Sequence, residues 1–244
     1  RLVGPDVVRA AALIGVCVMN YHGYLINQGG ELSRNFWGRL FHPWQGPLST
    51  RFAATFVLTA GVGVTLLTRR ATANRHGDPA AVSAKRWTLI RRGLVLYGFG
   101  LIFYELWSGS ILPYYGAMFV IASFLFTLAT PWIVAIGVSS ALAGAGINWW
   151  VYERRTDGYA VGWLTNPPTS SPRGLLFNVF VNGTHPLFPW LAFLCAGMIV
   201  GRTRPIGGTS PSVATKTVTS PRSAAKTSKP NRAAGTPAGT AERS

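Results

Sequence analysis

Acidic residues are scarce in this chain of 244 residues, which has 7 Asp and Glu against 23 Lys and Arg. Only 12% of the residues are charged, about half the share of a typical soluble domain, whereas 48% are hydrophobic. The net charge of +16 would suit a nucleic-acid binder, but the basic residues avoid the long apolar runs. Those runs exceed what one soluble core can hold, so the composition argues against a nucleic-acid partner and favours a membrane protein.

Cysteine is nearly absent as well. Cys17 and Cys195 each lie within an apolar run, so no disulfide framework can be read. No group of His, Cys and carboxylates has metal-ligand spacing, and no glycine-rich phosphate loop is present, so we expect no metal site. Gly61 and Gly63 fall within one apolar stretch, where close helix packing is their expected use.

Six apolar stretches approach the length of about 20 residues that a membrane helix needs. Their approximate bounds are residues 7–26, 52–68, 94–107, 111–129, 132–151 and 187–201. A shorter apolar piece, residues 175–181, is interpreted as a re-entrant or interfacial segment. The sequence thus predicts an all-α, polytopic transmembrane bundle of about six helices within residues 1–202.

The loop charges give these helices an orientation. The connection 69–92 carries seven Lys and Arg residues against Asp78 alone. Because Lys and Arg gather in cytoplasmic loops, we expect this connection and both termini to be cytoplasmic. Loops 27–51 and 152–185 are then expected outside the cell membrane.

Beyond residue 202 the composition changes to Ser, Thr, Pro, Ala, Gly and Lys, without an aromatic residue. Such a segment cannot bury enough apolar surface to fold, so residues 203–244 are predicted to form a disordered basic tail. The tail is expected to be solvated, although its basic residues would also suit anionic lipid headgroups.

Candidate functional residues lie at both ends of the first predicted helix. Asp6 and Arg9 are three residues apart and share a helix face, either as a functional pair or as a helix-start carboxylate beside an arginine that reaches the interface. Asn20, Tyr21 and His22 follow at the other end.

Further candidates lie near the predicted outer side. The imidazole of His42 could accept the proton of an attacking group or carry an acyl group, but beside Trp44 it equally fits an interfacial aromatic belt. Glu105 would orient a histidine, pair with an arginine or reach water. Tyr115 would line a cavity or anchor the interface, and His185 is interpreted as a loop residue.

Several motifs, in this order, resemble one family. They are Asp6-x-x-Arg9 with an apolar run that ends at Asn20-Tyr21, the stretch Phe41-His42-Pro43-Trp44-Gln45-Gly46, and residues 56–64, 111–116 and 188–193. They are similar to stretches of heparan-alpha-glucosaminide N-acetyltransferase and of the related bacterial DUF418 membrane proteins. The resemblance covers residues 1 to about 202. It implies a membrane acyltransferase that moves an acyl group from cytoplasmic acyl-CoA to a glycan or lipid-linked sugar outside.

The resemblance also implies roles for individual residues. His42 would be catalytic, and the supporting or substrate-binding residues would be Asp6, Arg9, Asn20, Tyr21, Trp44, Glu105 and Tyr115. The chain departs from the family in having Ala10 after Arg9, and one residue rather than two between His42 and Trp44. Family members continue with further membrane helices, so the alternative is a non-catalytic membrane protein, either a truncated member or a transporter-like component.

Overall fold

The computed structural model describes residues 3–31, 35–72, 78–104, 106, 109–165 and 171–203. Every regular element in these ranges is helical and none is a strand, which confirms the all-α class. Each predicted apolar stretch corresponds to one long helix, namely α1 (Val3–Asn27), α3 (Arg51–Thr72), α4 (Pro79–Tyr104), α5 (Leu112–Leu125), α6 (Thr130–Thr156) and α9 (Leu187–Thr203). The short elements are α2 (Phe36–Leu40), α7 (Gly162–Thr165), α8 (Pro172–Phe177) and the π-helix η1 (Asn178–Asn182).

Two of the described helices, α3 and α6, are long and apolar enough to cross a membrane. A third candidate span results if α8 with η1 and α9, which are bent by 58° at a break, count as one. Helix α5 is apolar but has 14 residues, fewer than a full crossing needs. By length and composition the described chain therefore has two or three candidate spans, and six crossings stay a prediction. The predicted tail lies outside the described residues except for Thr203.

Helices α3 and α4 extend into the basic connection that the sequence predicted as a loop. Helix α3 continues to Thr72, and α4 already begins at Pro79. Proline suits a first helical turn, and the Asp78 carboxylate accepts a hydrogen bond from the Ala80 N–H at 2.9 Å. As a result Arg91 lies on a helix, about 18 Å along the axis from its start.

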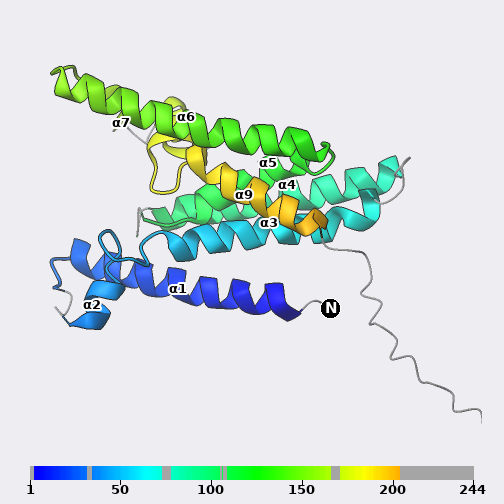
Figure 1. The fold of residues 1–244 in the computed structure, drawn as a ribbon, viewed down its shortest axis with the longest axis horizontal. Helices are drawn as coiled ribbons and strands as arrows, with labels where there is room; N and C mark the ends of the chain where they lie inside the picture. Colours follow the sequence, from blue (N-terminus) through cyan, green and yellow to red (C-terminus); the bar gives the residue numbers. More distant parts are fainter. Residues whose placement is uncertain are drawn as a thin grey trace, which may run out of the picture. The chain divides into compact units, whose positions relative to one another are not determined.

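Helix α3 is the centre of the arrangement. Helices α1, α4 and α9 pack on it, α5 packs on α4, and α6 packs on the other side of α9 (Figure 1). The core contains Val57 and Val64 of α3, Met118 of α5, and Leu194 and Met198 of α9. The start of α1 and the end of α9 lie at the same end of the bundle.

Glycines set how closely the helices approach. A Cβ atom at Gly61 would overlap the Leu194 carbonyl oxygen, and one at Gly197 would overlap the Leu58 carbonyl oxygen, so α3 and α9 touch through their backbones. The Thr65 hydroxyl donates across the same crossing to the Met198 carbonyl oxygen at 3.0 Å. Close packing at small residues with interhelical hydrogen bonds is how helices associate in lipid, and the expectation for Gly61 is confirmed.

Large apolar side chains remain on the outer faces of the long helices. Ile102, Val95 and Leu142 are 72%, 68% and 67% exposed. Exposed tryptophans lie toward both helix ends, for example Trp132 at the start of α6 and Trp149 near its end. Apolar outer faces with aromatic residues near the ends are typical of helices that contact lipid, so the helices have membrane-protein character.

The two glycines of α3 predict opposite outcomes for one substitution. Gly61→Leu should lower the free energy of unfolding by about 3 kcal/mol or more, because the side chain would enter the α9 backbone. Gly63→Leu should be tolerated, since no atom lies within 4 Å of a Cβ at that position. Melting of the two variants in detergent, followed by size-exclusion chromatography, measures the difference. Equal melting temperatures would contradict the glycine-mediated crossing.

Candidate functional site

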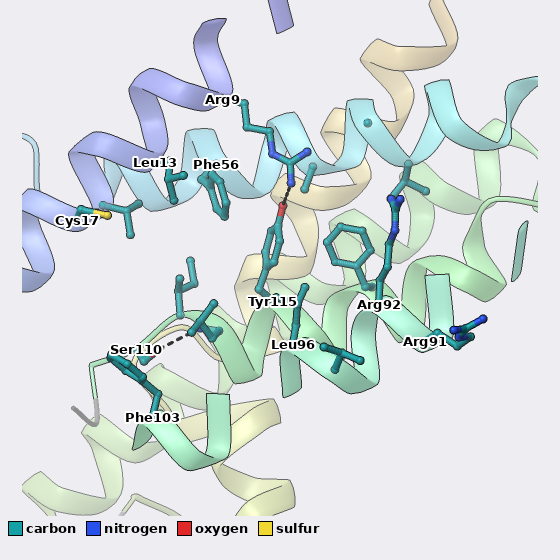
Figure 2. A pocket seen from close by; sticks show the side chains of 18 of the residues that line it. Arg9, Leu13, Cys17, Phe56, Arg91, Arg92, Leu96, Phe103, Ser110 and Tyr115 are labelled. Atoms are coloured by element: carbon teal, nitrogen blue, oxygen red, sulfur yellow. Dashed lines mark hydrogen bonds between the residues drawn. The ribbon is translucent and has the colours of Figure 1, made fainter. Parts of the chain in front are cut away.

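The larger of two adjoining cavities, the arginine cavity, lies between α1, α3, α4 and α5 and has a volume of about 1030 Å³. Its walls are mostly apolar, with Leu13 and Cys17 facing it from α1 and Leu96 and Phe103 from α4 (Figure 2). Gly63 also lines it, so this glycine leaves space for the cavity and does not serve helix packing. That part of the expectation for the two glycines is wrong.

Three arginines, Arg9, Arg91 and Arg92, give this cavity one charged end. Arg9 points at Tyr115 across the space, with its Nη2 atom 3.5 Å from the tyrosine hydroxyl (Figure 2). The Arg9 guanidinium also lies over the Phe56 ring, 5.6 Å from the centroid. Arg9 and Tyr115, which the sequence singled out separately, therefore belong to one site.

The smaller histidine cavity, about 400 Å³, lies where α1 ends and α3 begins. Its polar lining comes from segments far apart in the sequence, with Asn20 and Asn27 of α1, Ser49 and Thr50 before α3, and Thr184 and His185 before α9. Trp44 closes part of its wall. A few polar groups placed on a mainly apolar wall are typical of ligand sites.

Val16 and Asn20 line both cavities. The two spaces therefore adjoin along one face of α1, with the three arginines at one end and His185 and Trp44 at the other. Asn20 carries the only polar side chain among the described residues that both spaces share. An amide can donate and accept hydrogen bonds at once, so Asn20 can contact molecules in both cavities.

His42 holds its own loop together. Its Nδ1 atom accepts hydrogen bonds from the backbone N–H groups of Gln45 and Trp44 at 3.1 and 3.4 Å. A Cβ atom at Gly46 would lie 2.6 Å from the His42 carbonyl oxygen, so the tight turn needs glycine there. Because Nδ1 accepts, the neutral ring carries its proton on Nε2. The neighbours Pro43 and Trp44 line the histidine cavity, but His42 is not among its lining residues.

His22 has the opposite arrangement. Its Nδ1 lies 3.0 Å from the Phe41 carbonyl oxygen, which only accepts, so in the neutral ring the proton sits on Nδ1 and Nε2 has the lone pair. This bond ties the end of α1 to the loop that carries His42.

His185, which the sequence left as a loop residue, lies in the histidine cavity. Its ring packs edge-on against Trp190, with centroids 4.7 Å apart, and its Nδ1 is buried without a hydrogen-bond partner. Tyr114 fixes the segment, because its hydroxyl accepts from the Thr184 N–H at 3.2 Å and donates to the Asn178 side chain at 2.8 Å. A buried polar atom without a partner is rare in proteins, so Nδ1 of His185 is available to a hydrogen-bonding group in the cavity.

The remaining predicted residues are dispersed. Asp6 lies on an exposed face of α1, one turn before Arg9. Tyr21 is 61% exposed and lines neither cavity. Glu105 lies outside the described residues. Among the described residues no three His, Cys, Asp or Glu side chains gather as metal ligands. His185 and the arginines of α4 complete the site, and they come from segments that no sequence pattern connects to Asn20.

Comparison with models of protein families, with curated proteins and with solved structures finds no match to this chain. The chemistry of the two cavities is therefore what bears on function.

Burial makes the stability of the protein depend on pH through His185. Removal from water lowers the pKa of this histidine from 6.5 to about 4, because it disfavours the charged ring. Between these values the unfolded chain binds a proton that the folded chain does not, so stability should fall as the pH drops below about 6.5. Acidification to pH 5 should cost about 1–2 kcal/mol from this group.

The matched variant is His185→Phe, which keeps an aromatic ring but cannot titrate. Melting temperatures of both proteins in detergent at pH 7.5 and 5 provide the measurement. The wild type should lose more stability than the variant. Parallel losses would show that His185 is accessible to water and not buried.

Proposed function

We propose that the chain is a membrane acyltransferase, which moves an acyl group from cytoplasmic acyl-CoA to a glycan or lipid-linked sugar at the outer face. The observation that carries this proposal is that two cavities of different chemistry meet at Asn20. An enzyme that transfers a group between molecules from opposite sides needs two such spaces and one point of contact. The resemblance to the heparan-alpha-glucosaminide N-acetyltransferase family supplies the donor and acceptor classes.

The arginine cavity suits the donor. Guanidinium groups bind phosphates by paired, charge-assisted hydrogen bonds, and Arg91 and Arg92 stand where α4 borders the cavity. An acyl-CoA whose phosphates bind there would extend along the apolar walls toward Asn20. Among the described lining residues none is acidic, so no carboxylate opposes an anionic ligand.

The histidine cavity suits the acceptor. Asn20, Asn27 and Thr184 offer donors and acceptors for hydroxyl or amine groups, and the Trp44 ring offers an apolar face. In the transfer step the acceptor amine or hydroxyl attacks the thioester carbonyl. The C–S bond breaks, CoA leaves as the thiolate, and the proton lost by the acceptor goes first to an imidazole and then to the thiolate.

His42 is the imidazole that the resemblance implies. In the described turn Nε2 of the neutral ring carries the proton, so Nε2 can act as a base only in the other tautomer. That tautomer would place a proton on Nδ1 and break the bonds from Trp44 and Gln45. We therefore propose that the His42 turn opens when the acceptor enters beside Trp44.

The donor side is proposed to be cytoplasmic. Supporting this, residues from both predicted outer loops, 27–51 and 152–185, line the histidine cavity. Arg91 and Arg92 of the predicted cytoplasmic connection 69–92 line the arginine cavity. Both chain termini would then be cytoplasmic.

Thiol labelling of intact cells tests this orientation. The two variants are made in a background without Cys17 and Cys195. Glu31→Cys should react with an impermeant maleimide added to intact cells. Ser83→Cys should react only after the cells are lysed. Both positions are exposed, so access to the reagent depends on the side of the membrane. The reverse pattern would contradict the proposed orientation.

A substitution that preserves the turn tests the role of His42. The Asn side-chain oxygen can accept the same two backbone N–H bonds, as in turns that asparagine forms, but cannot act as a base. His42→Asn should therefore keep the loop and lower acyl transfer from radiolabelled acyl-CoA to membrane glycans by ~10²–10⁴-fold. His22→Asn serves as the control with a much smaller effect.

Full activity of His42→Asn, together with a loss in His42→Ala, would assign His42 to the loop alone. If correctly inserted wild-type protein transfers no label, the acyltransferase proposal fails and the non-catalytic alternative stands.

A further inference from the structure

The arginine cavity has two chemically distinct parts. Arg9, Arg91 and Arg92 lie at one end, and the remaining lining is mostly aliphatic and aromatic. Along α4 the lining runs from Thr88 to Phe103, which is about 22 Å of helix. A cationic end followed by a long apolar wall is complementary to an amphiphile with an anionic head and a hydrocarbon chain.

The cavity is also open along its side. Helix α1 packs on α3 and α4 packs on α5, and the cavity lies between these two pairs. Three lining residues on its flanks are themselves exposed, with Val95 at 68%, Leu13 at 47% and Phe103 at 43%. Both flanks carry lipid-type side chains, so a hydrocarbon chain can enter from the bilayer without crossing water.

We infer that the arginine cavity binds an anionic phospholipid of the adjacent leaflet, with its phosphate at Arg91 and Arg92 and one acyl chain along the apolar wall. Basic pockets between membrane helices are known to hold anionic headgroups in this way. The three arginines at the charged end of the cavity favour an anionic lipid over a zwitterionic one. This inference goes beyond the proposed reaction and does not depend on it, because the lipid need not be a substrate. An acyl-CoA donor would compete with the lipid for the same arginines.

Cys17 is a natural reporter for occupancy. It lines the cavity from α1 and is exposed, whereas Cys195 is buried against α6. Alkylation of Cys17 by N-ethylmaleimide, read by site-resolved mass spectrometry on full-length protein in detergent, is slowed when the cavity is filled. The added ligands are phosphatidylglycerol, phosphatidylcholine and palmitoyl-CoA, each titrated separately.

Two variant pairs locate the binding energy. The double variant Arg91→Gln, Arg92→Gln should need ~30-fold more phosphatidylglycerol for the same protection of Cys17, because each arginine contributes a factor of about five. Arg154→Gln with Arg155→Gln removes the same charge at the far end of α6 and should change it little. Gly63→Leu places a side chain in the cavity and should reduce the amount of co-purified phospholipid in native mass spectra. Gly98→Leu, equally free of neighbours on the outer face of α4, should retain it.

The lipid site is supported if phosphatidylglycerol protects Cys17 more strongly than phosphatidylcholine does. This difference should disappear in the variant that lacks Arg91 and Arg92. Protection by palmitoyl-CoA alone would overturn it and leave the cavity to the donor. Equal protection by both phospholipids, unaffected by the arginines, would overturn the headgroup assignment. No protection by any ligand would overturn the site. None of these readouts uses acyl transfer, so failure of the proposed reaction is a separate result.

Discussion

Direct contact between helix backbones at glycine is the constraint on which the structure depends. In lipid no hydrophobic force drives helices together, so association relies on close packing and interhelical hydrogen bonds. Gly61 meets Gly197 where α3 crosses α9, Gly93 meets Gly116 where α4 crosses α5, and Gly144 meets the Pro189 backbone where α6 crosses α9. On helix α1 the glycine contact is of another kind, because Gly15 meets a side chain, the Phe52 ring. Val16 of α1 belongs to the core and also lines the arginine cavity, so the packed face of α1 continues into the cavity wall.

Two of the arginines also stabilise the packing of the helices. Arg86 donates to the Ser123 carbonyl oxygen at 3.1 Å, and Arg202 donates to the Phe126 carbonyl oxygen at 3.1 Å, so both satisfy carbonyl groups at the end of α5. A positive charge there also complements the helix dipole. The basic surplus that gives the predicted orientation thus has structural uses besides topology. Arg91 and Arg92 are different, because they border a cavity in which a ligand can replace a backbone partner.

The sequence predicted the fold class and the six long helices because apolar length and composition are local properties. The sequence analysis overestimated the length of the basic connection 69–92, because Asp78 and Pro79 start α4 earlier than the hydropathy pattern indicated. It could not separate Gly61 from Gly63, because which glycine meets α9 depends on how α3 is rotated. The candidate site was harder still. Asn20 and Trp44 were identified through a resemblance, whereas His185 joins them from more than 140 residues along the chain, a proximity that no local pattern encodes.

The histidines His22, His42 and His185 show why residue type alone could not assign roles. His42, His22 and His185 lie near one end of the bundle, yet their nitrogen partners differ. The Nδ1 of His42 accepts from backbone N–H groups, that of His22 donates to a carbonyl oxygen, and that of His185 has no partner. Proton transfer needs a nitrogen whose lone pair faces the acceptor. In the described conformation the Nε2 of neutral His22 keeps a lone pair, but His22 does not line the cavity. His185 lines the cavity but is weakly basic through burial. His42 can serve only if its turn opens, so catalysis by His42 and closure of the Trp44 loop exclude one another.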